Sequence, residues 1–267
     1  MREPTILTNI DEDGIATLTM NRPELHNAFD DGLIEVMTDI LRTFEADPKV
    51  RLVMLTAIGK SFSAGADLNW MRRMADYSRE QNLADANGLA DLMRTLNTLS
   101  KPTIALVQGA AYGGGVGLVA CCDIAIATAR ASFCLSEVKL GLMPAVISPY
   151  VVAAIGSRAA RRFFLTAEAF DAGEAHRLGL VHLVVADDIE LAAAADRITA
   201  RLLANGPGAM AAAKKLVAAV AGRLVDDALI ADTAARIADQ RSSPEGREGL
   251  SAFLEKRTPA WVKGPQS

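Results

Sequence analysis

The first half of the chain alternates between two patterns of apolar residues. Short apolar runs bounded by turn residues, at 15–20, 52–56, 103–107 and 124–127, predict β-strands. Segments 30–44 and 87–99 predict helices, the first because its apolar residues have helical spacing, and the wholly apolar segment 114–122 predicts a buried helix. Strands that alternate with helices predict an α/β domain in which the strands pair largely in parallel.

The pattern changes after about residue 148, where alanine becomes frequent. Apart from a strand signal at 180–184, the segments 190–203, 209–220, 228–240 and 245–256 all predict helices. Gly206-Pro207 separates the first two of them and Ser243-Pro244 the last two, and Pro244 suits the first position of the last helix. We therefore predict a core over residues 1–200 and a helical region over 201–267 that packs against another body, such as a neighbouring subunit.

Composition excludes several classes of protein. The chain has 267 residues, of which 51% are apolar, and its net charge of −4 argues against a nucleic-acid or anionic-membrane surface. Residues 102–122 carry no charge and could span a bilayer, but five glycines interrupt the run, so a strand, a glycine turn and a buried helix account for it better. Residues 1–13 are polar and acidic, unlike a signal peptide. Cys121, Cys122 and Cys134 match no zinc or disulfide spacing, and we expect them to be reduced core residues of a cytoplasmic protein.

Three segments carry residues suited to chemistry. In the segment 61–68, small residues allow a ligand to approach the backbone, although an ordinary loop with Asp67 as a helix cap would have the same sequence. In the segment 109–117, a glycine cluster leads into an apolar helix, whose positive end suits an anion or an oxyanion formed during a reaction. In the segment 133–144, Glu137 lies among apolar residues, where desolvation would raise its pKa; the alternative is an exposed Glu137 that pairs with Lys139.

Together these segments resemble the enoyl-CoA hydratase/isomerase (crotonase) superfamily. The resemblance extends from Asn21-Arg22-Pro23 and Asn27-Ala28 to the terminal segment 253–257. It implies a crotonase-like ββα spiral core with a helical C-terminal region, assembled as a homotrimer or homohexamer. It implies an acyl-CoA substrate and no cofactor beyond the coenzyme A that the substrate carries. No metal is expected, because His26, His176 and His182 form no metal signature and are interpreted as structural.

The resemblance also assigns residues to a site. It implies that the N–H groups of Ala64 and Gly114 bind the thioester oxygen and that Glu137 transfers protons. It further implies that the loop with Gly65, Ala66, Asp67 and Leu68 holds the adenine and that Leu25 lies in the pantetheine channel. Tyr112 and Gly117 would lie near the acyl group. Phe253 and Lys256 would reach the site of an adjoining subunit.

Gly117 departs from the family pattern, because many hydratases of the family have a first glutamate there. Either Glu137 works with a hydroxyl, for which Tyr112, Ser136 and Ser148 are candidates, or the reaction needs only one carboxylate, as in an isomerase. A glycine at this position would also open a pocket for the branch of a β-methyl substrate.

The segments 67–74, 121–123 and 144–150 resemble the methylglutaconyl-CoA and carboxygeranoyl-CoA hydratases of leucine and acyclic-terpene breakdown. The substrates of those enzymes carry a distal carboxylate, with which Arg72 or Arg73 could pair; the alternative is two solvated arginines on a helix.

The leading hypothesis is therefore an enoyl-CoA hydratase, and the alternatives are an enoyl-CoA isomerase and a non-catalytic acyl-CoA binder. The retained Glu137 argues against the binder. The hypothesis of a nicotinamide-dependent oxidoreductase is supported only by the weak pattern Gly115-x-Gly117-x-x-Ala120. A serine hydrolase is disfavoured, because the sequence has no Gly-x-Ser-x-Gly motif.

Overall fold

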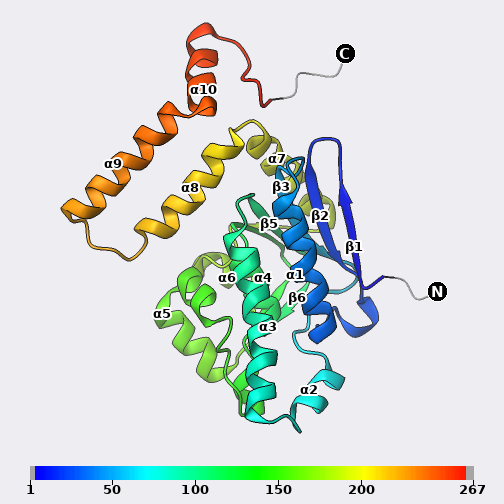
Figure 1. The fold of residues 1–267 in the computed structure, drawn as a ribbon. Helices are drawn as coiled ribbons and strands as arrows, with labels where there is room; N and C mark the ends of the chain where they lie inside the picture. The colour runs from blue at the N-terminus through cyan, green and yellow to red at the C-terminus, as the bar shows by residue number, and fades with distance from the viewer. Residues whose placement is uncertain (1–3, 263–267) are drawn as a thin grey trace. The chain divides into compact units, whose positions relative to one another are not determined.

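The computed structural model describes residues 4–262 (Figure 1). Its described residues divide into two compact units, one formed by residues 4–99 and 103–196 and the other by 100–102 and 197–262. Residues 1–3 of the N-terminal segment and 263–267 of the helical region, for which predictions were made, lie outside the described residues.

A six-stranded sheet forms the centre of the first unit. Its strands lie in the order β1 (Ile6–Ile10), β2 (Ile15–Met20), β3 (Leu52–Ala57), β5 (Thr103–Val107), β7 (Ile124–Thr128) and β10 (Leu183–Val185). β1 pairs antiparallel with β2, and every other neighbouring pair is parallel. The predicted strands at 15–20, 52–56, 103–107 and 124–127 are therefore confirmed.

A second, smaller sheet contains β4 (Ser61–Ser63), β6 (Ala110–Tyr112), β8 (Ser132–Cys134) and β9 (Phe170–Asp171). Each of β3, β5 and β7 is followed by one strand of this sheet and then by a helix, so the chain repeats a ββα unit three times. This repeat confirms the predicted spiral fold. Because β4, β6 and β8 are parallel, their carboxyl ends lie at the same edge of the small sheet.

Helices cover the first unit. α1 (Asp31–Ala46) and α3 (Arg79–Thr98) lie side by side (Figure 1), and α4 (Gly114–Cys121) is the predicted buried helix. The others are α2 (Leu68–Met74), α5 (Ser148–Thr166) and α6 (Ala172–Leu178), with short 3-10 helices η1 (Pro23–Leu25) and η2 (Glu137–Leu140). α3 begins eight residues before the predicted start because Ser78 and Gln81 form a capping box there.

Three further predictions are settled by the structure. Leu180 N donates a hydrogen bond to Ala175 O at the end of α6, so the strand predicted at 180–184 begins only at Leu183. The uncharged run 102–122 forms β5, β6 and α4, as expected, and no helix in residues 4–262 is long and apolar enough to cross a bilayer. The three cysteines are buried and form no disulfide, which confirms them as core residues.

The second unit is helical. The boundary of the two units falls within α7 (Asp188–Leu203), and α8 (Pro207–Val220), α9 (Asp227–Ser242) and α10 (Pro244–Glu255) pack on one another. Both oxygens of the Glu245 carboxylate accept hydrogen bonds from backbone N–H groups of the first turn of α8, at 2.9 and 2.7 Å. The large apolar side chains that these helices and the loop between α8 and α9 leave exposed include Leu216, Val217, Leu224, Val225, Ile230, Ile237, Leu250, Phe253 and Leu254.

Candidate active site

Three segments of the first unit meet at the carboxyl edge of the small sheet. A Cβ added to Gly65, in the loop after β4, would lie 3.0 Å from Tyr112 O, at the end of β6. A Cβ added to Gly113, in the turn after β6, would lie 3.2 Å from Oε1 of Glu137, which follows β8. Both glycines have positive φ, 87° and 51°, so a side chain at either position would be strained as well as crowded. The sequence motifs at 61–68, 109–117 and 133–144 therefore form one site.

Glu137 supplies the titratable group of this site. Burial raises the pKa of its carboxyl, and its Oε2 is buried without a hydrogen-bond partner among the residues that the structure describes. Lys139 is exposed, and no ion pair joins it to Glu137 within residues 4–262. The structure therefore contradicts the alternative of an exposed Glu137 that pairs with Lys139. A desolvated carboxyl without a partner is suited to accept and return a proton.

Gly114 supplies a backbone donor beside Glu137. Gly114 is the first residue of α4 after the cap residue Gly113, and its N–H has no hydrogen-bond partner in the described part of the chain. A negative charge at this helix end would meet the positive end of the peptide dipoles.

Ala66 supplies a second free donor. Phe29 and Ala66 form an isolated parallel bridge, in which Phe29 N donates to Gly65 O at 2.8 Å and Asp67 N donates to Phe29 O at 2.9 Å. In such a bridge the residues on either side make the bonds, so the N–H of the central residue points away from the partner strand. The Ala66 N–H has no partner within the described residues, and Ala66 itself is half-buried.

The prediction that Ala64 binds the thioester oxygen is wrong. Its N–H donates a 2.9 Å hydrogen bond to His26 O, so it is already occupied within the fold. His26 is held in a left-handed backbone conformation, φ 53°, and its Nδ1 lies 3.1 Å from Ser61 Oγ. The donor available in this loop is that of Ala66, two residues later.

Phe29 connects the two free donors, although the sequence pattern did not single it out. Its backbone bridges Ala66, and a Cβ added to Gly114 would lie only 2.6 and 2.7 Å from Cε2 and Cζ of its ring. Phe29 is 1% exposed, so its position is fixed by the core. The only sequence signal was its place directly after the quoted Asn27-Ala28 pair.

Buried polar groups hold the loop that carries Ala66. Asn27 is fully buried; its Oδ1 accepts from Arg22 N at 2.8 Å, and its Nδ2 donates to Ile58 O at 2.9 Å and to Ser61 O at 2.8 Å. Asp67 accepts hydrogen bonds from two N–H groups at the start of α2 and pairs with Arg22 at 3.1 Å. The Asp67 carboxylate is thus a helix cap, as the alternative interpretation expected.

Two of the hydroxyls considered as partners of Glu137 are engaged elsewhere. The Tyr112 hydroxyl lies 3.5 Å from Ser132 Oγ, at the start of β8, and Ser148 Oγ donates to Ala145 O at 2.7 Å. Ser136 Oγ makes no cap hydrogen bond. Tyr112 therefore borders the site with its backbone carbonyl rather than with its hydroxyl.

The prediction that Gly117 opens a pocket is also wrong. A Cβ added there would overlap Ile147 Cγ2 and lie 3.2 Å from Met93 Cε, so apolar side chains already fill the space.

The remaining predicted residues are more exposed. Leu25 is 42% exposed and borders a groove of about 830 Å³, and Leu68 is 69% exposed at the start of α2. Phe253, which is 80% exposed, and Lys256 lie at the end of α10 in the second unit. The side chains of Arg72 and Arg73 bind Asn69 and Asp31, respectively.

The histidines were predicted to be structural, and no metal site was expected. His176 Nδ1 lies 3.0 Å from Val181 O, and His182 Nδ1 accepts from Ala125 N at 3.0 Å, so both have structural contacts. Within residues 4–262 no cluster of His, Cys, Asp or Glu is arranged to hold a metal ion.

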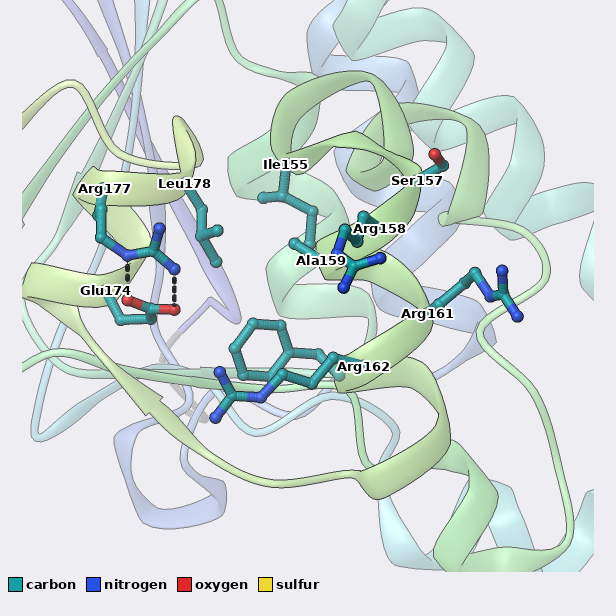
Figure 2. Close-up of a pocket in the computed structure, with 10 residues that line it drawn as sticks. Ile155, Ser157, Arg158, Ala159, Arg161, Arg162, Glu174, Arg177 and Leu178 are labelled. Atoms are coloured by element: carbon teal, nitrogen blue, oxygen red, sulfur yellow. Dashed lines mark hydrogen bonds and ion pairs between the residues drawn. The ribbon is translucent and has the colours of Figure 1, made fainter.

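A separate basic groove of about 730 Å³ lies between α5 and α6 (Figure 2). Arg158, Arg161 and Arg162 line it from α5, and Arg177, which pairs with Glu174 at 2.6 Å, lines it from α6. Figure 2 shows the Arg161 side chain directed away from the Arg177–Glu174 pair. None of the predicted site residues lines this groove.

Comparisons with known proteins agree with the sequence resemblance. The family model described as enoyl-CoA hydratase/isomerase matches residues 11–264. The crystal structure of an enoyl-CoA hydratase from Shewanella pealeana is 51% identical, with a TM-score of 0.94 over 97% of this chain and 96% of that one. An enoyl-CoA hydratase structure from Mycobacterium smegmatis is 35% identical, with a TM-score of 0.91 over 98% and 100% of the two chains. A crotonyl-CoA hydratase from Syntrophomonas wolfei is 34% identical over 249 residues, which are 92% of this chain and 94% of that protein.

Proposed function

The chain belongs to the enoyl-CoA hydratase/isomerase family, and from that premise we propose that it adds water across the double bond of a 2-enoyl-CoA thioester. The observation that supports this most is the meeting of one desolvated carboxyl, Glu137, with the free N–H groups of Ala66 and Gly114 at one edge of the small sheet. Hydration of a conjugated thioester needs a group that moves protons and donors that stabilise an enolate.

The reaction divides into two proton transfers around one enolate. Glu137 takes a proton from water as the oxygen of that water bonds to the β-carbon, and the electron pair of the double bond moves onto the thioester oxygen. The N–H groups of Ala66 and Gly114 stabilise the resulting O⁻, each by about 3 kcal/mol. Protonated Glu137 then gives its proton to the α-carbon, which restores the thioester and the carboxylate.

The coenzyme A moiety of the substrate requires its own contacts, and no further cofactor is proposed. The loop of Ala64, Gly65, Ala66, Asp67 and Leu68 would hold the adenine, mainly through its backbone, since Asp67 is used as a cap. The exposed Leu25 and its groove would receive the pantetheine.

The acyl group is a separate question. The segments 67–74, 121–123 and 144–150 favour 3-methylglutaconyl-CoA or a related branched substrate, whereas the Syntrophomonas relative is named for crotonyl-CoA. A panel of enoyl-CoA thioesters, followed by loss of the conjugated thioester absorbance and by identification of the product, tests both. Loss of absorbance with a 3-hydroxyacyl-CoA product supports hydration, and absence of that product from every substrate contradicts it.

Double-bond isomerisation is the second candidate, because the site has a single carboxylate. An isomerase moves a proton between two carbons of the acyl chain and needs no bound water. A shifted double bond as the product, without a 3-hydroxyacyl-CoA, would assign the chain to this activity instead.

The second unit favours assembly into a homotrimer or homohexamer. Its helices leave large apolar side chains exposed, among them Phe253 and Leu254 at 80% and 77%. Phe253 and Lys256 would contribute to the acyl-CoA site of an adjoining subunit. Light scattering of the eluted protein measures the mass; a monomeric protein with full activity would contradict both roles.

A further inference from the structure

A chain of hydrogen bonds runs from the guanidinium of Arg22 to the free N–H of Ala66. Arg22 Nη1 donates to Ala28 O at 2.9 Å, and this carbonyl belongs to the same peptide group as the N–H of Phe29. Phe29 N donates in turn to Gly65 O at 2.8 Å, and that carbonyl belongs to the same peptide group as the N–H of Ala66. Two peptide groups therefore separate the guanidinium from the donor.

The chain determines the direction of the Ala66 N–H. In a trans peptide group the C=O and N–H bonds point in opposite directions, so a partner that holds the carbonyl also aims the N–H. The isolated bridge between Phe29 and Ala66 is a weak constraint by itself, because strand pairing needs more than one pair of short segments to be stable in water. The direction of the donor therefore depends on contacts from outside the bridge, and Arg22 makes one of them.

Arg22 also bonds to the segment of Ala66 from its other side. Its Nη2 donates to Asp67 Oδ2 at 3.1 Å, one residue after Ala66. The other carboxylate oxygen of Asp67 accepts from Asn69 N at 2.8 Å and from Trp70 N at 3.3 Å, at the start of α2. One planar guanidinium thus holds both segments of the bridge, and Asp67 links it to a helix.

The position of Arg22 is itself fixed. Its carbonyl accepts hydrogen bonds from Leu25 N at 3.0 Å and from Asn27 N at 2.9 Å, and its N–H donates to Asn27 Oδ1 at 2.8 Å. Its Nη1 also donates to Asp30 Oδ2 at 3.2 Å, and its side chain is only 13% exposed. The guanidinium therefore extends from a fixed backbone and has little freedom to reorient.

We propose that Arg22 is a positioning residue, which orients the Ala66 N–H toward the thioester oxygen through two peptide groups. The proposal rests on the proposed function and deepens it, since it names the side chain on which one of the two free donors depends. A buried ion pair adds little net stability, because the loss of hydration offsets most of the attraction. The planar fork of arginine supplies direction instead, which the single ammonium group of lysine does not.

Two variants separate this role from stability. Arg22→Lys keeps the positive charge but cannot bond to all of the acceptors with one planar fork. Arg22→Met/Asp67→Asn removes both charges of the buried ion pair, so neither is left unpaired, and asparagine keeps an oxygen that can cap α2. Asp30, which is 31% exposed, remains solvated in this double variant.

Two measurements report on the donor. The kcat for crotonyl-CoA should fall at least about tenfold in both variants while KM changes less, because a misplacement of about 1 Å can cost 10²-fold in rate. Bound dimethylaminocinnamoyl-CoA should show a smaller red shift of its absorbance than in the wild type, since hydrogen bonds to its thioester oxygen polarise the chromophore. A purely structural role would lower the Tm without changing the red shift of the folded protein. Wild-type kcat and red shift in either folded variant would overturn the proposal.

Arg42→Met is the matched control. Arg42 also bonds to two aspartates, Asp39 on α1 at 3.3 Å and Asp91 on α3 at 2.5 Å, neither of which belongs to the segments of the bridge. This variant should keep the wild-type kcat and red shift, and an equal loss in it would overturn the specific role of Arg22. Failure of the proposed function is distinguishable: the wild type would form no 3-hydroxyacyl-CoA, while the red shifts of wild type and Arg22 variants would still be compared.

Discussion

Replacing Glu137 with glutamine should abolish most of the activity and stabilise the protein at neutral pH. The substitution keeps the shape of the side chain and removes both its charge and its capacity for proton transfer. As an acid/base residue, Glu137 is expected to account for about 10²–10⁴ of the rate, so kcat for crotonyl-CoA should fall by that factor while KM changes little.

The stability change follows from the environment of the carboxyl. Burial raises the pKa of Glu137, and its Oε2 is buried without a partner among the described residues, so ionisation of this carboxyl costs more in the folded state than in the unfolded chain. The neutral amide of glutamine avoids this cost of ionisation, so the Tm of Glu137→Gln should exceed that of the wild type by about 2–4 °C for each kcal/mol recovered.

The pH dependence has a definite sign. Below the pKa of a glutamate in the unfolded chain, about 4.3, both states hold the proton and Glu137 costs nothing. As the pH rises above that value, the unfolded state releases its proton before the folded state does, so the wild type loses stability until the pH exceeds the raised pKa of the folded state. The Tm advantage of Glu137→Gln should therefore be small at pH 4 and larger at pH 7.

The measurement is the Tm of wild type and Glu137→Gln at pH 4 and pH 7, alongside their hydration kinetics. Glu35→Gln, on an exposed position of α1, controls for the loss of a surface carboxylate. A variant less stable than wild type at pH 7, or a Tm difference that is equal at both pH values, would refute the desolvation argument. Near-wild-type turnover would refute the acid/base role independently.

Three further substitutions test the geometry around Glu137. Ala66→Pro removes a free N–H donor and should lower kcat about 10²–10³-fold with an unchanged circular dichroism spectrum; full activity in the folded variant would exclude the donor. Phe29→Leu and the control Phe44→Leu both truncate a buried ring, and each should lower the free energy of unfolding, measured in urea, by about 1 kcal/mol. Only Phe29→Leu should also lower kcat, by about tenfold. Equal kcat values for the two variants would contradict the role of Phe29 in positioning the two donors. Asn27→Ala removes three hydrogen bonds and should lower the free energy of unfolding by about 2–4 kcal/mol; a loss under 1 kcal/mol would mean that water replaces the amide.

The long elements of the fold could be predicted from the sequence, because their periodicity extends over enough residues. α1 and β2 are examples: five of the six buried residues of α1 are apolar, and buried positions alternate along β2. The short strands could not be predicted. β4, β6 and β8 have three residues each, too few to show a period of two, and their burial depends on pairing with strands distant in sequence. These strands nevertheless bring the three motifs of the site together.

The filled space at Gly117 could not be predicted for a related reason. Glycine in a helix indicates that something approaches closely, but not what approaches. Ile147 is 30 positions later in the sequence and is brought to α4 by the start of α5, an element that no periodic pattern indicated. The sequence alone therefore permitted an open pocket, whereas the structure has an isoleucine there.

The error at Ala64 has a more local cause, which explains why a motif can be correct while a residue within it is not. Gly65, which lies between Ala64 and Ala66, has a φ of 87°, so the N–H groups of the two alanines do not follow the alternation of a regular strand and face different surroundings. Residues 26–29, which lie between η1 and α1, contact both alanines. His26 O accepts the hydrogen bond of the Ala64 N–H, and Phe29 forms the bridge with Ala66. The hydrogen bond to His26 O uses the N–H of Ala64. The bridge to Phe29 uses Gly65 O and Asp67 N, so the N–H of Ala66 stays free. The motif at 61–68 specifies a loop that a ligand can approach, but residues 26–29 select which donor of that loop remains for the ligand.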